Sequence, residues 1–394
     1  MKNIRLKEIK NLEEAEEELL KIGCDKYGIG LMAPKAIHRI IKIEDLEVRT
    51  ANVLKQEMLS IGGECAVAKG TIAFKNRTTD ALLMGTLKQY NGVISKLKEQ
   101  PFKLKELAEK LKYLLESKPK TMKIGNRKFK FGTRTYIMGI INITSDSFSG
   151  DGILDVDGAI DRALEMESQG ADIIDIGGES SRPYAKPVSL EKELERVVPV
   201  VKKLVNRTNI PISIDTYKSK VADKTLELGI DMVNDISALR MDKKMPSVVA
   251  KHKVPIVLMH MKGVPRTMQI EPFYEDVSSE IYSFLQERIE FAVRNKIKKE
   301  NIIVDPGIGF GKTLDHNLEI IRKLKEFKSL NCPILIGPSR KSFIGKILES
   351  PVGQRLEGTL GAVSACIVNG ADIVRVHDVK ECVRAARVMD AIVR

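Results

Sequence analysis

From residue 121 to residue 394, one pattern of hydrophobic and polar positions recurs eight times. Each unit begins with a short apolar run, places a polar residue at the end of that run and continues into an amphipathic segment. Short runs rich in Ile and Val are typical of strands buried on both faces, and the helical periodicity that follows predicts a helix. The predicted strands are residues 136–141, 171–176, 210–214, 232–233, 254–259, 302–304, 333–336 and 373–374.

Alternating strands and helices predict an α/β fold with a parallel sheet. The segment 121–394 has about the usual length of a (β/α)8 TIM barrel, and the amphipathic stretches 156–168 and 190–205 fit its helical ring. An open doubly wound sheet is the alternative, but its first turn is normally rich in glycine and this one is not. Eight units therefore favour a closed barrel. A small hairpin over 123–131, with its turn at Gly125, is predicted just before it.

Residues 1–120 follow a different pattern and predict a smaller, separate α+β domain, joined by a linker at 118–120. No set of residues in this region has the composition of a catalytic site, so its function stays unassigned. Its predicted elements are helices at 12–22, 51–60, 80–97 and 103–116 and a strand at 71–75.

Composition narrows the function classes. The chain has 394 residues, of which 43% are hydrophobic, so two domains are expected. No apolar run is as long as a membrane span, and the N-terminus lacks a signal-peptide core, so we expect no membrane contact. Five cysteines without metal-ligand spacing predict a reducing, cytoplasmic location and no structural zinc. A net charge of +12 without a dense basic run argues against nucleic acid. Solvated surface lysines are its ordinary explanation, and a site for an anionic small molecule is the more specific alternative.

A glycine-rich loop follows the strand at 302–304, and its sequence comes close to two nucleotide-binding motifs. It begins with Asp305 and Pro306 and contains three glycines before Lys312. A phosphate-binding Walker loop would need glycine at position 306, and a dinucleotide fingerprint would need glycine at position 312. Both motifs fail by one residue. Asp305 is therefore interpreted as a ligand group at the rim of the barrel.

Polar residues stand at all eight predicted strand ends. In a barrel of parallel strands these ends converge on one mouth, where active sites of this fold are found. Single polar residues there often have only a structural role, but eight out of eight is difficult to attribute to capping. The residues are Asn142, Glu179, Asp215, Asn234 with Asp235, His260, Asp305, residues 339–342, and Arg375 with His377.

One group of these side chains suits a flat heterocycle. Asp215, Asn234 and Asp305 are mainly hydrogen-bond acceptors, and a carboxylate accepts two parallel bonds from an amidine-like edge. Lys341 would donate to a carbonyl or nitrogen of the same ring.

A second group suits a polyphosphate. Arg375 and His377 are cationic donors, and Asn142 lies across the predicted mouth, where its carbonyl oxygen can also bind Mg²⁺. Together the two groups predict a substrate with a heteroaromatic ring and a diphosphate. No Ser/His/Asp or Cys/His arrangement indicates covalent catalysis.

These motifs, in this order, resemble the dihydropteroate synthase family, the pterin-binding barrel enzymes of folate synthesis. The resemblance covers residues 133–394. The matching segments are 138–149, 170–183, 212–218, 234–235, 259–263, 305–313, 339–343, 355–359 and 375–378. It implies a transferase that joins a pterin-methyl diphosphate to an arylamine, releases diphosphate and pairs as a homodimer. Residues 1–120 resemble an additional N-terminal region of some longer relatives. We infer no function for them from this resemblance.

The resemblance implies roles residue by residue. Catalysis would involve Asp215, Lys341, Arg375 and His377. The pterin would contact Asp215, Asn234, Asp305, Phe310 and Lys341. The diphosphate would contact Asn142, Arg375 and His377, with Mg²⁺ at Asn142. The arylamine would contact Ser181, Arg182, Pro183 and Ser342, and Phe310 and Lys341 would also frame it. Two departures affect the substrate loops: Ser145 stands where the family usually has proline, and Tyr184 follows Pro183 in place of the usual glycine.

Three alternatives remain open. The acceptor is either 4-aminobenzoate or a ribosylated, phosphorylated aniline of the kind used for methanopterin. A methyltransferase that moves a methyl group from a methylated pterin to a corrinoid uses a similar barrel but has no diphosphate to hold. The third alternative, from another functional class, is a regulatory module that binds a pterin and has no catalytic activity.

Overall fold

The computed structural model describes residues 3–116, 120–143, 155–180 and 186–394. It divides into two compact units, Met1–Ser117 (unit 1) and Lys118–Arg394 (unit 2).

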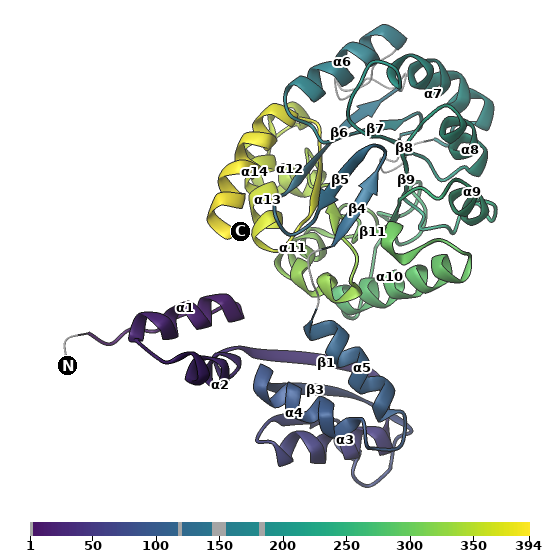
Figure 1. Cartoon of the computed structure of the whole chain (residues 1–394). Helices are drawn as coiled ribbons and strands as arrows, with labels where there is room; N and C mark the ends of the chain where they lie inside the picture. The colour runs from purple at the N-terminus through teal and green to yellow at the C-terminus, as the bar shows by residue number, and fades with distance from the viewer. Residues whose placement is uncertain (1–2, 117–119, 144–154, 181–185) are drawn as a thin grey trace. The chain divides into compact units, whose positions relative to one another are not determined.

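Unit 2 is a barrel of eight parallel strands, as the sequence predicts (Figure 1). Seven neighbouring pairs run in the order β11-β10-β9-β8-β7-β6-β13-β12, and a parallel bridge between Val304 and Ile334 links the two ends. All eight predicted strands are therefore confirmed. The strands are β6 Tyr136–Asn142, β7 Ile173–Gly177, β8 Ile212–Asp215, β9 Met232–Asp235, β10 Ile256–Met259, β11 Ile302–Asp305, β12 Leu335–Ile336 and β13 Ile373–Val376.

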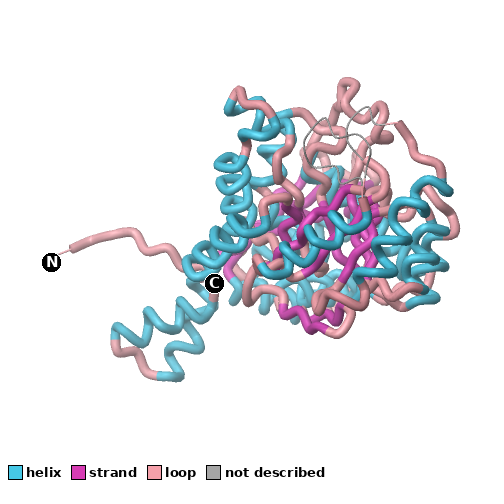
Figure 2. Tube along the Cα trace, turned by 90° about the horizontal axis from the view of Figure 1, so that it is seen from above, coloured by secondary structure: helices cyan, strands magenta, loops and turns pink. Residues whose placement is uncertain are grey.

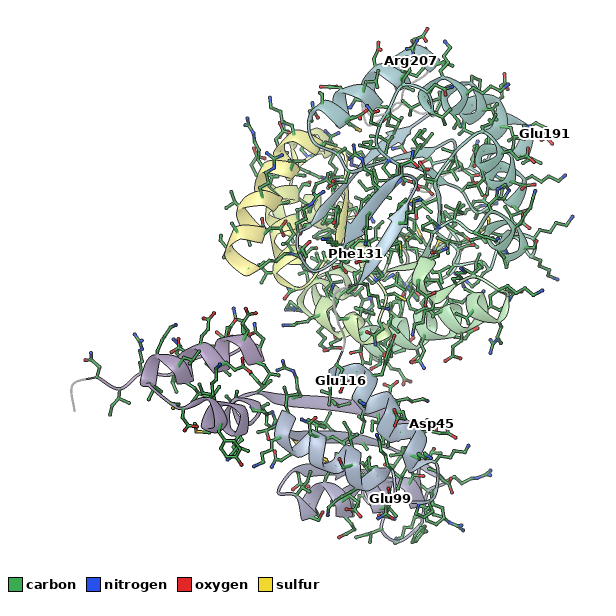
Figure 3. The ribbon with its side chains drawn as sticks, viewed as in Figure 1. Asp45, Glu99, Glu116, Phe131, Glu191 and Arg207 are labelled. Carbon is green, nitrogen blue, oxygen red and sulfur yellow. The ribbon has the colours of Figure 1, made fainter. Side chains whose placement is uncertain are left out.

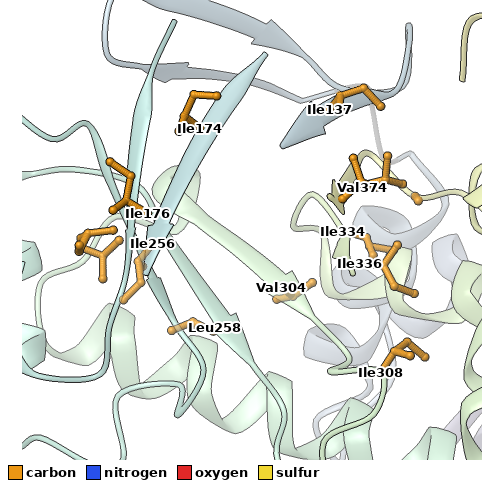
Figure 4. Packing of buried hydrophobic residues seen from close by; sticks show 14 of the residues in the cluster. Ile137, Ile174, Ile176, Ile256, Leu258, Val304, Ile308, Ile334, Ile336 and Val374 are labelled. Carbon is orange, nitrogen blue, oxygen red and sulfur yellow. The ribbon is translucent and has the colours of Figure 1, made fainter. Parts of the chain in front are cut away.

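Helices surround these strands, which occupy the middle of the unit in Figure 2. The outward-facing Ile, Val and Leu side chains of the strands belong to one buried cluster with residues of the helices. Figure 4 labels Ile174, Ile256 and Val304 among these buried residues. The predicted helix 156–168 is confirmed, and the next one ends a residue earlier than predicted, at Leu204. The helices are α6 Val156–Ser168, α7 Leu190–Leu204, α8 Ser219–Glu227, α9 Met245–His252, α10 Val277–Arg294, α11 Leu314–Arg322, α12 Ser342–Leu348, α13 Leu356–Val368 and α14 Val379–Val393, with 3-10 turns η1 Lys299–Asn301, η2 Leu324–Leu330 and η3 Val352–Gln354.

The inside of the barrel changes character along its axis. Side chains of a strand alternate between its two faces, so every second residue points inward. At one level these inward residues are apolar and belong to one buried cluster: Met138, Ile173, Met232, Val257, Ile303, Leu335 and Ile373. Two residues further along, on the same face, four of these strands carry Asp175, Asn234, Asp305 and Arg375. The barrel therefore has an apolar lower layer and a polar upper layer.

The predicted hairpin closes the apolar end. It consists of β4 Thr121–Ile124 and β5 Arg127–Lys130, paired antiparallel. Met122, Ile124, Phe129 and the neighbouring Phe131 belong to the same buried cluster as the lower layer. Figure 3 labels Phe131 there, while Arg207 lies on the outer surface. This end of the barrel is therefore filled by side chains, and the polar layer lies at the opposite end.

A repeated Gly-Ala-Asp or Gly-Ile-Asp triplet precedes three strands of the barrel. Its glycine closes a helix with positive φ, as at Gly170 (φ 100°), Gly229 (φ 109°) and Gly370 (φ 94°). Its aspartate accepts a backbone N–H of the preceding strand, at 2.8–2.9 Å. The pairs are Asp172 with Ile137, Asp231 with Ile212 and Asp372 with Ile334. These aspartates lie at the N-terminal strand ends and stabilise the fold, whereas function belongs to the opposite face.

Unit 1 is an α+β domain with a three-stranded antiparallel sheet in the order β1-β3-β2. Its core includes Leu54, Leu83, Tyr90 and Leu104. The elements are α1 Leu12–Ile22, α2 Lys26–Ala36, β1 His38–Glu47, α3 Val48–Ser60, β2 Glu64–Val67, β3 Thr78–Thr86, α4 Leu87–Leu97 and α5 Leu104–Leu115. In neither unit does a described helix have the length and apolar character needed to cross a bilayer.

Two predicted elements of unit 1 are wrong. The predicted helix 80–97 is a strand up to Thr86 and a helix only from Leu87, because Ala81 and Leu83 alternate with exposed residues and Thr86 caps the helix with Gln89. The predicted strand 71–75 is a turn, in which Phe74 has a φ of 53°. Short apolar runs do not distinguish a strand from a turn when their neighbours in space are unknown.

Candidate active site

The polar upper layer of the barrel forms a hydrogen-bonded network centred on Arg375. The guanidinium donates from Nε to Asp175 Oδ2 (2.6 Å) and from Nη2 to Asp215 Oδ2 (2.7 Å). Asn234 Nδ2 donates to the same Asp175 oxygen (2.9 Å). The Arg375 side chain is 19% exposed, so the network is largely shielded but open to the mouth.

This network joins the two predicted groups of the site. Asp215 and Asn234 are predicted for the ring and Arg375 for the diphosphate, yet all three contact one another directly or through Asp175. Burial, together with the neighbouring Asp175, raises the pKa of Asp215 to about 7, against the attraction of Arg375. The pKa of Arg375 is raised by Asp175 and Asp215, although burial opposes its charge. The residues predicted for the ring and for the diphosphate therefore form one continuous network, with Arg375 bonded to Asp215.

Asp175 is a site residue that the sequence reasoning missed as a candidate. It is fully buried, and its Oδ1 atom accepts no hydrogen bond from any residue that the structure describes. The signal was available: Asp175 lies two residues after the inward-facing Ile173, at the same level as Asn234 and Arg375 on their strands.

Asp305 reaches the mouth from β11, and the glycine loop behind it has a steric explanation. Gly307 N donates to Asp305 Oδ1 (2.6 Å). A Cβ on Gly307 would lie 1.9 Å from His260 O, and one on Gly311 would lie 2.6 Å from Lys262 O. Both glycines also have positive φ values, which favour glycine. The glycines thus allow the loop to pack tightly against the segment after β10, which supports the interpretation that it is not a nucleotide loop.

Lys341 lies against this loop and beside Asp305. Its ammonium donates to Ile308 O and lies 4.8 Å from the centre of the Phe310 ring. Burial lowers the pKa of Lys341 to about 8, although Asp305 favours its charged form. Burial also raises the pKa of Asp305, against the effect of Lys341. The structure therefore brings together three predicted site residues, and Ser342 follows at the exposed start of α12.

His377 and Ser339 connect β13 to the loop after β12. The Ser339 hydroxyl lies 3.0 Å from His377 Nδ1, and the backbone N–H of His377 donates to the same oxygen (3.2 Å). Arg340 forms a two-pronged ion pair with Asp378. Arg340, one of the predicted residues at this end, is therefore held in a structural ion pair. His377 lies two residues after Arg375, just beyond the end of β13 at Val376.

The motif at residues 355–359 supports this loop. Arg355 donates to Arg340 O (3.0 Å), and the Thr359 hydroxyl accepts from Arg340 N (3.0 Å). Arg340 has a φ of 55°, an uncommon value for a residue with a side chain. These bonds fix the backbone of Arg340 and thereby the position of Lys341, the next residue.

Asn142 ends β6 next to Gly177, at the same edge as Asp215. A Cβ on Gly177 would lie 3.6 Å from Asn142 Oδ1 and 3.6 Å from Asp215 Cβ, so the two side chains flank the glycine. Within the described residues, no three His, Cys, Asp or Glu side chains are grouped to hold a metal ion. A lone carbonyl oxygen at the mouth nevertheless fits Mg²⁺, which usually takes one or two protein ligands and completes its shell with phosphate oxygens and water.

A cleft of about 280 Å³, including its open mouth, adjoins Asp215. Lys218 bridges the carboxylates of Glu179 and Glu193, and Tyr217 Oη donates to Glu179 (2.9 Å). Glu179 is therefore held by its neighbours, and Glu193, Tyr217 and Lys218 are residues of this region that the strand-end pattern missed. The residues that line the cleft are Glu179, Ser180, Glu193, Asp215, Thr216, Tyr217, Ile236 and Pro265.

Two strand-end residues have structural partners. Both oxygens of Asp235 accept bonds from the turn that follows, from Ser237 and Leu239. His260 is 6% exposed and lies against Lys312 behind the glycine loop. Of the predicted arylamine contacts, Ser181, Arg182 and Pro183 lie outside the described residues, as do Ser145 and Tyr184.

Comparison with known proteins adds independent evidence. The family model described as pterin binding enzyme matches residues 138–377. The dihydropteroate synthase of Synechocystis sp. is 47% identical over 262 residues, which cover 66% of this chain and 91% of that protein. The probable bifunctional folylpolyglutamate synthase/dihydropteroate synthase of Halobacterium salinarum is 38% identical over 385 residues, which cover 98% of this chain and 46% of that protein. This last match therefore includes unit 1.

Solved structures agree with these matches. The dihydropteroate synthase of Yersinia pestis in a sulfonamide drug complex superposes with a TM-score of 0.67 at 40% identity, covering 69% of this chain and 98% of that one. The enzyme of Xanthomonas albilineans with 4-aminobenzoic acid gives a TM-score of 0.65 at 39% identity, covering 70% and 98%.

Proposed function

This chain belongs to the pterin-binding enzyme family and is a transferase of the dihydropteroate synthase type, and from that premise we propose its reaction and the roles of its residues. It condenses (7,8-dihydropterin-6-yl)methyl diphosphate with 4-aminobenzoate and releases diphosphate. The observation that carries the proposal is the polar layer in which Asp215, Asn234 and Asp305 stand beside Arg375 at one barrel mouth.

The ring of the pterin binds to the acceptors of this layer. Its amino and ring N–H groups form a flat row of donors, which a buried carboxylate accepts in pairs. Asp305 and Asp215 supply carboxylates, and Asn234 supplies an amide that can complement either kind of group. Lys341 donates to the ring from the other side, giving up its bond to Ile308 O.

The reaction needs no nucleophile from the enzyme. The C–O bond between the pterin methylene and diphosphate breaks, and the electron-rich pterin delocalises the positive charge that develops on carbon. Arg375 and His377 stabilise the departing diphosphate, and Asn142 would hold Mg²⁺, which would supply further charge neutralisation. The amine nitrogen then forms the new C–N bond and loses its proton to solvent. The protein contributes charge stabilisation and placement.

The amine binds beside the pterin methylene, between the Phe310–Lys341 pair and the loop after β7. Ser181, Arg182, Pro183 and Ser342 are the proposed contacts of its ring and carboxylate. The Xanthomonas albilineans enzyme with 4-aminobenzoic acid supports 4-aminobenzoate as the acceptor. The test offers the protein pterin diphosphate, Mg²⁺ and each of two amines, 4-aminobenzoate and the ribosylated aniline phosphate. Mass spectrometry then identifies the product.

The same assay separates the rival activity. A methyl transfer from a methylated pterin to a corrinoid would consume no diphosphate ester, so it leaves Arg375 and His377 without a role. Stoichiometric diphosphate release with each condensation is expected. Methyl loss from a methylpterin without diphosphate release would refute the proposal.

The pH dependence of kcat/KM for the pterin substrate is predicted to be bell-shaped. Asp215 must be ionised to accept, so the rate rises with pH through its pKa of about 7. Lys341 must be protonated to donate, so the rate falls as pH rises through its pKa of about 8. Rates measured from pH 5 to 10 check the shape. In Lys341→Arg the fall at alkaline pH should disappear, because arginine stays charged over this range.

We propose that residues 121–394 carry the whole transferase activity and that residues 1–120 form a separate domain. The Synechocystis relative matches only 66% of this chain yet 91% of its own length, so a barrel alone makes an enzyme there. A protein that begins at Lys118 is therefore expected to keep kcat and both KM values within about twofold of the full chain. A loss of activity in a folded truncated protein would assign unit 1 a catalytic part.

The oligomeric state and the location of the protein belong to the same proposal. A homodimer is expected from the family resemblance, and light scattering of the purified protein tests it. A cytoplasmic location fits the five cysteines, which are all free in the structure.

A further inference from the structure

Lys312 is a buried lysine that the proposed reaction does not use. It is 3% exposed and follows the glycine loop that carries Phe310. Its amine lies 3.0 Å from His260 Nδ1, donates to Phe310 O (3.0 Å) and approaches His260 O (3.5 Å). No carboxylate of the described residues forms an ion pair with it. Burying an amine costs free energy unless hydrogen bonds compensate for the lost water, and Lys312 makes these bonds to neutral groups only.

The surroundings of Lys312 and His260 determine the protonation state of His260. The Lys312 amine and His260 Nδ1 share a hydrogen bond whose direction depends on the tautomer of a neutral imidazole. Burial and the nearby Lys312 lower the pKa of His260, in agreement with a neutral imidazole. The imidazole is fixed by its edge-on contact with Phe284, with ring centres 4.8 Å apart. Lys312 therefore ties the Phe310 carbonyl to a rigid group of the neighbouring strand end.

The glycine loop as a whole is held by side chains. Four successive carbonyls each accept a bond from a different side chain: Ile308 from Lys341, Gly309 from Gln269, Phe310 from Lys312 and Gly311 from Tyr274. Lys341 can exchange its hydrogen bond to Ile308 O for one to a substrate. Lys312 is buried and cannot reach a substrate. The position of Phe310 thus depends on Lys312.

The position of Asp305 is fixed by hydrogen bonds that do not involve the Lys312 amine, although burial raises the pKa of the Asp305 carboxyl and the charge of Lys312 opposes that rise. Asp305 is part of β11, its carboxylate accepts from Gly307 N, and its carbonyl accepts from His260 N (2.9 Å). Phe310 has a weaker backbone anchor, a bond from its N–H to Gly307 O (3.2 Å). Loss of the Lys312 amine should therefore displace the Phe310 side of the site and leave the pterin side in place.

We propose that Lys312 is a positioning residue that fixes Phe310 beside Lys341 and thereby shapes the pocket for the arylamine. The identity of that ligand rests on the proposed function, whereas the anchoring of Phe310 does not. The role is that of a rigid support, since Lys312 touches neither the pterin nor the reacting atoms.

The kinetic test uses Lys312→Met, which keeps the length of the side chain and removes the donor. The KM for 4-aminobenzoate is expected to rise about tenfold or more, because one buried hydrogen bond is lost. The dissociation constant for 6-hydroxymethylpterin should stay within about twofold. Lys325→Met, at an exposed lysine of η2, is the control and should match the unaltered protein. An equal loss of amine and pterin affinity, or no change in either, would overturn the proposal.

Hydrogen–deuterium exchange provides a readout that needs no turnover. In Lys312→Met, amides of residues 307–311 should exchange at least about tenfold faster, while those of 302–305 stay protected. Unchanged exchange of the loop would reject the anchoring role. If Lys312→Met does not fold, Lys312→Gln takes its place, since its shorter side chain cannot bridge His260 and Phe310 and should give the same selective change. If the unaltered protein forms no product with either amine, the proposed function fails, and exchange alone still decides the role of Lys312.

Discussion

Arg375→Met is expected to lower kcat by about 10²- to 10³-fold, the usual cost of removing one charged group that stabilises a leaving group in the transition state. Pterin affinity should change far less. In the free protein, Arg375 Nη2 occupies Asp215 Oδ2, an acceptor that the pterin also needs. The pterin must therefore compete with Arg375 for this carboxylate, and removing the arginine removes the competition along with a favourable charge.

Arg375→Met is also expected to destabilise the fold, because Arg375 forms ion pairs with Asp175 and Asp215. Without the guanidinium, Asp175 and Asp215 remain as two largely buried carboxylates without their cation. Breaking such a pair typically costs about 3 kcal/mol of unfolding free energy, so thermal unfolding must be measured first. Arg375→Lys keeps the charge and should recover stability more than rate. Arg207→Met, at an exposed arginine of unit 2, is the control (Figure 3). Equal losses of kcat and pterin affinity would contradict the assignment of Arg375 to the diphosphate.

The barrel could be predicted from sequence because its strands obey a local rule. A strand buried on both faces needs consecutive apolar residues, so runs such as 136–141 and 302–304 stand out without knowledge of their neighbours. The site could be predicted for a related reason. Once the strands are parallel, their carboxyl ends lie at one mouth, and a charged residue such as Asp305 after a wholly apolar run becomes a candidate for function.

The parts that failed depend on contacts between distant segments. Asp175 lies inside a predicted strand, so its position in the run hid that it faces the same interior as Asp215 and Arg375. His260 has the same local appearance as a catalytic histidine, and only its contact with Lys312, 52 residues away, reveals a structural role. In unit 1, the run at Ala81 is compatible with a helix or a strand until its partners in the sheet are known.

Asp305→Asn is expected to lower kcat/KM for the pterin substrate by about 10²- to 10³-fold, because two charge-assisted hydrogen bonds are weakened or reversed. The amide replaces one acceptor oxygen with an N–H₂ group, which would face the donors of the pterin ring. The internal bond from Gly307 N can persist, since the amide oxygen can still accept it. The expected defect is therefore in recognition and not in the geometry of the loop.

Stability distinguishes this variant from a damaged fold. Burial raises the pKa of Asp305, so folding disfavours its ionised form, and the stability of the protein falls as pH rises through that pKa. A neutral amide removes this penalty, and at pH 8 the melting temperature of Asp305→Asn should equal or exceed that of the unaltered protein. Calorimetric titration with 6-hydroxymethylpterin measures the loss of binding in the same samples, with Asp315→Asn at an exposed site as the control. A lower melting temperature with intact pterin affinity would mean that Asp305 supports the loop, and the pterin would then have to be held by Asp215 and Asn234 alone.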